Sequence, residues 1–205
     1  MVGTAAALVS FAESRELLAV LAGLAVEAKQ VERTAEALGR ALAADEQQHV
    51  EPAPPAEIPP TLYLGLDGTG VPMRQTEVAG RAGKQANGTA QTRKAKRCTV
   101  WSAEGRDADG GPVRDAGSVS YSAAIESAAT RDTEATRSAF AHRVEREACR
   151  RGFARAKRQA VLGDGAPGIW NLAGESFPAA IQIVDRFHAQ EHLNGVAKGL
   201  LLLAA

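Results

Sequence analysis

The sequence predicts an α/β fold in which a helical hairpin and a linker precede a mixed sheet with the element order β-β-β-α-β-α-β-α. Three observations predict it. Residues 13–46 are rich in Ala, Leu, Glu, Gln and Arg and contain no proline, which is typical of helices. Residues 51–60 hold five of the nine prolines, which exclude a helix or a central strand there. From residue 61 onward, short apolar runs alternate with amphipathic stretches.

The composition bounds the size and the environment of the protein. Its 205 residues, 45% of them hydrophobic, suffice for one sizeable core and a smaller helical piece. We therefore expect a helical hairpin over 1–50, a proline-rich linker over 51–60 and a core over 61–205. The 24 basic and 24 acidic residues balance, so any nucleic-acid binding has to come from local basic patches. The two cysteines lack metal-binding spacing and are expected to be buried free thiols. The longest apolar run has ten residues, too few to cross a membrane, which predicts a cytoplasmic protein without a membrane partner.

The N-terminal hairpin is expected to consist of helices over 16–22 and 28–43, with Gly23 as the turn. The second helix has an apolar face, and its opposite face is polar and includes Lys29 and Arg33. Two short helices joined through a glycine suit a helix-turn-helix DNA reader. A hairpin that only packs or dimerises has the same pattern and is commoner, so both interpretations stay open. The apolar face comprises Val31, Ala35, Leu38 and Leu42.

A basic stretch follows the first predicted strand. Residues 80–97 contain no acid and are rich in Gly, Asn and Thr, which predicts an exposed, mobile hairpin arm. Such an arm would attract the phosphates of DNA whatever its base sequence, although a solvated basic loop has the same composition. The candidate DNA-contacting residues of this stretch are Arg81, Lys84, Arg93, Lys94, Lys96 and Arg97.

The remaining elements follow from periodicity and from chain breakers. A long helix is expected where Phe140, Val144 and Ala148 share one face. In chain order, the expected elements are strands over 97–103 and 117–125, a helix over 134–158, a strand ending at Asp164, a short helix over 169–173, a strand over 180–185 and a helix over 188–203.

The first and the fourth predicted strands each deliver an aspartate at their end. Three leucines alternate along the first strand, which stops at Asp67, and the fourth stops at Asp164; glycines flank both acids. This element order is that of the ribonuclease H-like sheet, in which the first and fourth strands are neighbours, so the two carboxylates are expected to converge. Two carboxylates so close together stay ionised at low cost only with a cation between them. Mg²⁺ suits this role because it binds carboxylate and water oxygens. A pair of such ions stabilises the attacking and leaving oxygens of a phosphoryl displacement. The glycines would let a nucleic-acid backbone approach closely.

Six segments carry a resemblance to a known family: AGLAVEAKQVERTAEALG in the helical part, then LGLDGTGVPMR, TRKAKRCTVW, PVRDAGSVSYSAAIE, VLGDGAPGIWNLA and IQIVDRFHAQEHL. They resemble bacterial insertion-sequence transposases of the ISKra group, which are DDE enzymes with a ribonuclease H-like fold. The segments match in order at family-like spacing, and the resemblance covers nearly all of the chain.

The resemblance implies that Asp67 and Asp164 are the first two catalytic acids and hold a two-metal site of Mg²⁺ or Mn²⁺. It implies that Asp185 and His188, a D-x-x-H pair, form an accessory structural or DNA-contact element near the site. It also implies helix-turn-helix binding of element ends, double-stranded DNA of transposon ends and target as partners, and a homo-oligomeric enzyme. The third acid of such enzymes is a glutamate on a helix further downstream. The chain ends at Ala205 before that position, which implies a truncated transposase whose ability to cut DNA is an open question.

Two other functions stay open. A transposase remnant that binds DNA without cutting it would use the same helices and basic arm, and would need neither aspartate. His188, Glu191 and His192 also match the H-x-x-E-H pattern of zinc metallohydrolases, although the sequence offers no third ligand after them. Trp101 and Trp170 are expected in the core rather than as base-stacking platforms, because each adjoins an apolar segment.

Overall fold

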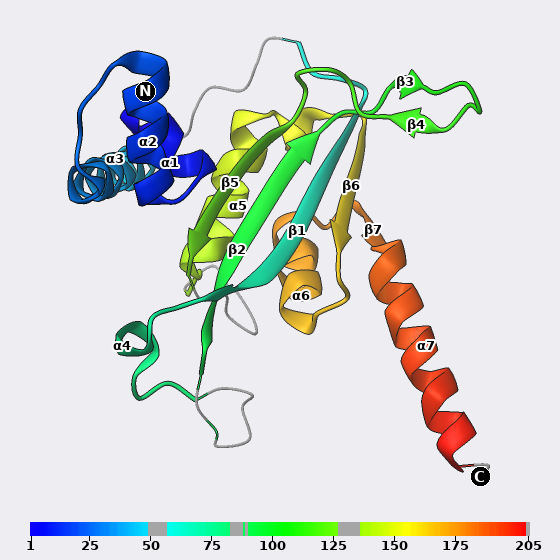
Figure 1. Cartoon of the computed structure of the whole chain (residues 1–205). Helices are drawn as coiled ribbons and strands as arrows, with labels where there is room; N and C mark the ends of the chain where they lie inside the picture. Colours follow the sequence, from blue (N-terminus) through cyan, green and yellow to red (C-terminus); the bar gives the residue numbers. More distant parts are fainter. Residues whose placement is uncertain (49–56, 83–87, 89, 127–135, 204–205) are drawn as a thin grey trace. The chain divides into compact units, whose positions relative to one another are not determined.

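The computed structural model describes residues 1–48, 57–82, 88, 90–126 and 136–203, and the chain divides into two compact units, Met1–Val50 and Glu51–Ala205 (Figure 1). Most of the linker predicted over 51–60 lies outside the described residues. None of the helices in the described part of the chain combines the length and the hydropathy that a membrane crossing requires.

The described residues of the N-terminal unit form three helices, α1 (Val2–Leu8), α2 (Phe11–Ala22) and α3 (Ala28–Gln48). A capping box starts α2, which therefore begins earlier than predicted. The hydroxyl of Ser10 accepts from the backbone N–H of Glu13, whose carboxylate accepts from the backbone N–H of Ser10. Gly23 ends α2 in the left-handed conformation (φ 63°), at the predicted turn. The helix α1 was not predicted, because its seven residues are too few to show a periodic pattern.

Only part of the apolar face predicted for α3 is covered within the N-terminal unit. Val31 is fully buried, whereas Leu38 and Leu42 are exposed. Lys29 and Arg33 are exposed as well, and Lys29 makes an ion pair with a glutamate of the same helix. Each of the three helices contacts the other two. The unit is therefore a small helical bundle that leaves both basic and apolar side chains of α3 exposed.

A five-stranded mixed sheet forms the centre of the C-terminal unit. In spatial order its strands are β5 (Ser120–Ile125), β2 (Thr92–Trp101), β1 (Thr61–Pro72), β6 (Arg158–Gly163) and β7 (Ile181–Val184). β2 is antiparallel to β1 and β5, and β6 is parallel to β1 and β7. The predicted α/β class with a mixed sheet is confirmed, and so is the adjacency of the first and fourth predicted strands. A separate two-stranded ribbon joins β3 (Gly105–Arg106) and β4 (Pro112–Val113).

The helices of this unit are α4 (Gln75–Val78), α5 (Ala139–Arg150), α6 (Pro167–Ser176) and α7 (Arg186–Leu203), with a short 3₁₀ helix, η1 (Phe153–Arg155). The prediction of one helix over 134–158 is wrong at both ends. The described residues 136–138 are not helical, and α5 begins at Ala139 with Ser138 as its N-cap. Gly152 adopts the left-handed conformation (φ 68°) and ends the helical stretch, and the chain turns through η1 into β6. Residues 134 and 135 of the predicted helix lie outside the described residues.

The hairpin arm predicted over 80–97 is wrong in its second half. Residues 92–97 belong to β2 and pair with β1 along their whole length, and 95–97 also pair with β5. Pairing of the backbone amides holds this part of the strand in the sheet although its side chains are polar. Lys84 lies outside the described residues.

The hydrophobic core lies on one face of the sheet, where α5 and α6 cover it (Figure 1). The leucines at positions 62, 64 and 66 of β1 are buried there. Because successive strand residues point to opposite faces, Gly65 and Asp67 lie on the other face. Figure 1 shows no helix among the described residues of this unit in front of β1, β2 and β5 on that second face.

Candidate active site

Asp67 lies on β1, and Asp164 directly follows β6, the strand that is hydrogen-bonded parallel to β1. The ladder between β1 and β6 pairs Gly65 with Leu162, which are 97 apart in residue number (162 − 65). The two aspartates are also 97 apart (164 − 67) and follow the end of that ladder by two positions. Strand pairing therefore brings both aspartates to the same edge of the sheet, although they are far apart in sequence.

Asp185 directly follows β7, the next strand of the sheet, and its backbone N–H donates to the carbonyl of Gly163 at 2.8 Å. The β6–β7 ladder pairs Gly163 with Val184, and the following residues are Asp164 and Asp185. Oδ1 of Asp185 accepts from the backbone N–H groups of the second and third residues of α7, at 2.8 and 3.2 Å. These hydrogen bonds, led by the one from the N–H of His188, lower the pKa of the Asp185 carboxyl. The aspartate of the D-x-x-H pair thus caps α7, and Nδ1 of His188 lies 3.6 Å from the same Oδ1.

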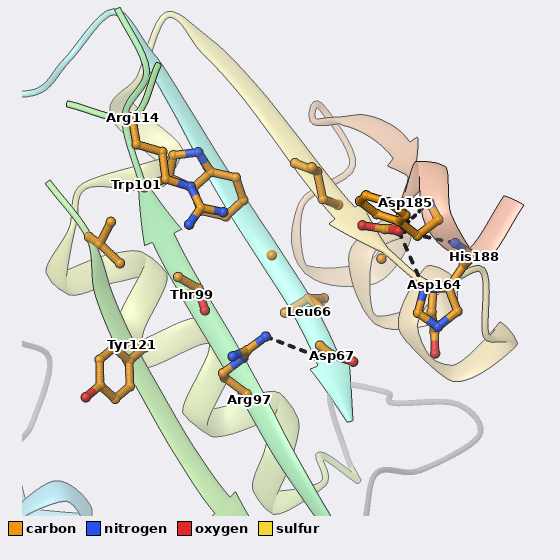
Figure 2. Close-up of a pocket in the computed structure, with 15 residues that line it drawn as sticks. Leu66, Asp67, Arg97, Thr99, Trp101, Arg114, Tyr121, Asp164, Asp185 and His188 are labelled. Carbon is orange, nitrogen blue, oxygen red and sulfur yellow. Dashed lines mark hydrogen bonds and ion pairs between the residues drawn. The ribbon is translucent and has the colours of Figure 1, made fainter. Parts of the chain in front are cut away.

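One open groove of about 580 Å³ joins these side chains (Figure 2). Its lining comes from β1, β2, β5 and β6, from the loop before β5 and from the start of α7. Asp67, Asp164, Asp185 and His188 all line it. The structure therefore brings together in one groove the residues that the sequence assigns to catalysis and to its accessory element.

Asp67 is held by its neighbour on β2. Nη2 of Arg97 lies 3.1 Å from Oδ2 of Asp67, because the antiparallel register places the two residues opposite each other. Oδ1 accepts from the backbone N–H of Gly68 at 2.7 Å. Both partners of the ion pair are about half exposed (57% for Arg97 and 46% for Asp67), so water screens it and the guanidinium can be displaced.

Asp164 begins the loop that leads into α6. Its Oδ1 accepts from the backbone N–H of Ala166 at 2.9 Å, and no described residue donates to its other carboxylate oxygen. The preceding Gly163 is required by packing: a Cβ there would lie 2.7 Å from Cγ2 of Ile169 in α6. A Cβ on Gly68 would likewise meet the side chain of Lys96 at 3.2 Å. Protein side chains therefore occupy the space beside these two glycines, whereas a Cβ on Gly165, which follows Asp164, would meet nothing closer than 3.9 Å. Close approach of a nucleic-acid backbone beside the acids stays a prediction.

Lys96 lies on the core side of the sheet, and the charges of both aspartates affect its pKa. Its ammonium is 5.6 Å from the centre of the Phe140 ring. Burial, followed by repulsion from Lys94, lowers the pKa of Lys96, while Asp164 and Asp67 oppose that change.

The other basic candidates do not gather in the groove. Arg81, Arg93, Lys94 and Lys96 line a second cavity of about 350 Å³, which Glu126 also lines. Among the basic residues of this stretch that the structure describes, only Arg97 lines the groove with the acids. Lys29 and Arg33 are exposed on the N-terminal unit.

The donor set fits a divalent ion in part. Two aspartates with water can hold Mg²⁺ or Mn²⁺, which favour carboxylate oxygens. Occupancy by such an ion would require Arg97 to leave Oδ2 of Asp67. Among the residues that the structure describes, no group of three or more His, Cys, Asp or Glu side chains is arranged to hold a metal ion. His188, Glu191 and His192 accordingly form no such group.

Sequence reasoning missed two side chains that line the groove. Arg114 lies before β5, with its guanidinium carbon 4.6 Å from the centre of the Trp101 ring, and Tyr121 is 71% exposed on β5. Trp101 itself is buried, as predicted, and Trp170 packs against the core. The alternation around Tyr121 points the wrong way, because it places the tyrosine in phase with the apolar Val119 and Ile125 although all three are exposed. No sequence signal links Arg114 to Trp101.

Comparison of the chain with protein-family models gives no match, and no curated protein matches it either.

Proposed function

We propose that the C-terminal unit is the catalytic core of a DDE-type transposase with a ribonuclease H-like sheet, which cleaves DNA at insertion-sequence ends and joins it to a target. One observation carries the proposal: Asp67 on β1 and Asp164 directly after the adjacent parallel strand β6 each follow the end of the β1–β6 ladder by two residues and line one groove. The resemblance of the sequence to ISKra-group transposases supports the same assignment.

In this mechanism, Asp67 and Asp164 would hold Mg²⁺ or Mn²⁺ through their carboxylates. Such an ion would supply activation of the attacking water and neutralisation of charge on the phosphate. Water attacks a phosphodiester at the element end, the bond from phosphorus to the 3′ oxygen breaks, and that oxygen takes up a proton. The freed 3′-hydroxyl then attacks a target phosphodiester, so the number of phosphodiester bonds is conserved in this second step. Arg97, released from Asp67, is placed to contact the phosphate.

The N-terminal unit and the basic residues of β2 supply DNA contacts in this proposal. Lys29 and Arg33 are exposed on one helix, and Arg81, Arg93 and Lys94 line a cavity beside β2. Such cations would bind phosphates without regard to sequence. Double-stranded DNA is the proposed partner, and a homo-oligomer the proposed active form.

A second candidate function is a DNA-binding protein that does not cut. The observation that favours it is that, among the described residues, no three His, Cys, Asp or Glu side chains are arranged to hold a metal ion, although Asp185 and His188 line the same groove as the two aspartates. This protein would occupy element ends through the same basic residues.

A cleavage assay separates the two functions. End-labelled duplexes that cover the DNA on both sides of the gene are incubated with the protein and Mg²⁺ or Mn²⁺. We expect nicks that Asp67→Asn and Asp164→Asn each reduce at least about 100-fold. Asp107→Asn is the matched control, because Asp107 is an exposed acid that does not line the groove. Binding without nicks, unchanged by either substitution, would support the second function and reject the first.

A further inference from the structure

The face of the sheet opposite the core forms a trough with a low floor. The ladders place Tyr121, Thr99 and Gly65 side by side on β5, β2 and β1. The tyrosine stands at one side, and the small side chain of Thr99 lies on the floor. A Cβ on Gly65 would meet the ring of Trp101 at 3.0 Å, so the indole lies over this glycine and covers that part of the floor. The trough is part of the groove that contains the acids.

Aromatic and guanidinium surfaces border this trough. Trp101 stacks on Tyr63, with ring centres 5.5 Å apart and an angle of 14° between the planes. The guanidinium carbon of Arg114 lies 4.6 Å from the centre of the Trp101 ring, and Arg114 itself is exposed. Tyr121 is exposed without a stacking partner among the described rings. Figure 2 shows Arg114 and Trp101 at one end of the groove, Tyr121 at its side and Asp67 with Arg97 further along β1 and β2.

Flat π surfaces flanked by cations match the chemistry of unpaired nucleotides. A nucleobase stacks on a tyrosine ring or on a guanidinium plane, and the phosphate that follows it is attracted by arginine. Bases inside a duplex are already stacked on one another and cannot offer their faces to the protein. The occupant that fits this trough is therefore single-stranded.

We propose that this face binds single-stranded DNA, with one base on Tyr121, another on Arg114 backed by Trp101, and the phosphates running past Arg97 toward Asp67. The direction toward Asp67 rests on the proposed function, because it identifies the trough as the path of the strand beside the cleaved phosphate. Binding of the strand needs neither metal nor catalysis.

The test measures fluorescence anisotropy of a labelled single-stranded oligothymidylate of about 12 nucleotides with the full chain in EDTA. We expect Tyr121→Ala and Arg114→Ala each to weaken binding at least about fivefold, the lower end of the range for loss of one stacked base. Tyr121→Phe keeps the ring and Arg106→Ala removes an exposed arginine outside the groove, so both should bind within about twofold of wild type. A duplex of the same length should compete poorly.

Four results would overturn the proposal. The wild-type protein could fail to bind the strand, or the Tyr121→Ala and Arg114→Ala proteins could both bind it as tightly as wild type. The duplex could compete as well as the single strand, or Tyr121→Ala could change only the oligomeric state, which would assign the face to a second copy of the chain. Because Tyr121 is a surface residue, its substitution should not unfold the protein, and circular dichroism checks this. Absence of nicks in the cleavage assay would reject the proposed function and leave the binding result standing, so the two failures are distinguishable.

Discussion

Substitution of Gly163 by alanine tests how tightly the loop that carries Asp164 is packed against α6. The new Cβ would lie 2.7 Å from Cγ2 of Ile169, whereas two carbon atoms prefer about 3.5–4.0 Å. The helix or the strand therefore has to shift by roughly 1 Å. Overpacking of this kind costs about 1–3 kcal/mol, and the lower backbone entropy of alanine offsets about 0.5–1 kcal/mol of it. The expected net loss in the free energy of unfolding is about 1–2 kcal/mol.

Urea unfolding followed by circular dichroism measures this loss, which corresponds to a decrease in Tm of about 2–8 °C for a chain of this size. Ile169→Leu provides the rescue, because leucine has no methyl group on its Cβ. The double variant should recover at least about 1 kcal/mol relative to Gly163→Ala. Gly174→Ala is the matched control: it lies inside α6, its Cβ would have no neighbour closer than 3.9 Å, and it should stabilise by about 0.5–1 kcal/mol. A Gly163→Ala protein as stable as wild type, or a double variant without recovery, would refute the contact.

Three further predictions concern charge and protonation. Arg97→Gln should tighten Mn²⁺ binding about two- to fivefold by titration calorimetry, because the cation no longer competes for Asp67. Burial, followed by repulsion from a nearby glutamate, raises the pKa of Cys98 to about 12, so in a Cys149→Ala protein the thiol should resist disulfide reagents at pH 8 until unfolding. The free energy of unfolding should fall as pH rises above 9.0, because the Cys98 thiol then ionises in the unfolded protein while it stays protonated in the folded protein. Asp185→Ala should cost about 1 kcal/mol and speed amide exchange in the first turn of α7.

Each of these predictions has an outcome that contradicts it. Arg93→Gln changes an arginine of the same strand outside the groove, and an equal effect on Mn²⁺ would remove the role of Arg97. Rapid modification of Cys98 in the folded protein would show that the thiol is accessible. Asp185→Asn keeps an oxygen that can cap the helix, so it should exchange like wild type. The Asp185 cap should also weaken as pH falls below 3.8 through the lowered pKa of that carboxyl.

The sequence predicts which segments become strands better than it predicts where the strands end. Alternating leucines mark β1 because one face of that strand is buried, but the prediction that the strand stops at Asp67 is wrong: β1 continues to Pro72 and pairs with β2 over those residues. The N-terminal part of β2 carries basic residues, so its membership of the sheet depends on pairing with β1 and β5, which no local pattern reveals. Gly152 weakens a helix on propensity alone, but only its left-handed conformation shows that α5 stops before it.

The candidate site was predictable where it follows from strand order, and not where it follows from register. Asp67 and Asp164 come together because β1 and β6 are neighbours, which the element order predicts. The ion pair with Arg97 depends on the antiparallel register of β1 and β2, and the contact of Arg114 with Trp101 on the path of the loop before β5. Neither can be derived from spacing in the sequence.

The most direct test of the central claim is a calorimetric titration with Mn²⁺ of wild type, Asp67→Asn, Asp164→Asn and the double variant. If the two carboxylates share one site, each single substitution should weaken Mn²⁺ binding at least about tenfold, and the double substitution should cost much less than the sum of the two. Asp107→Asn should bind like wild type. Wild-type affinity in either single variant, or two independent losses that simply add, would show that the aspartates do not act together and would contradict the account.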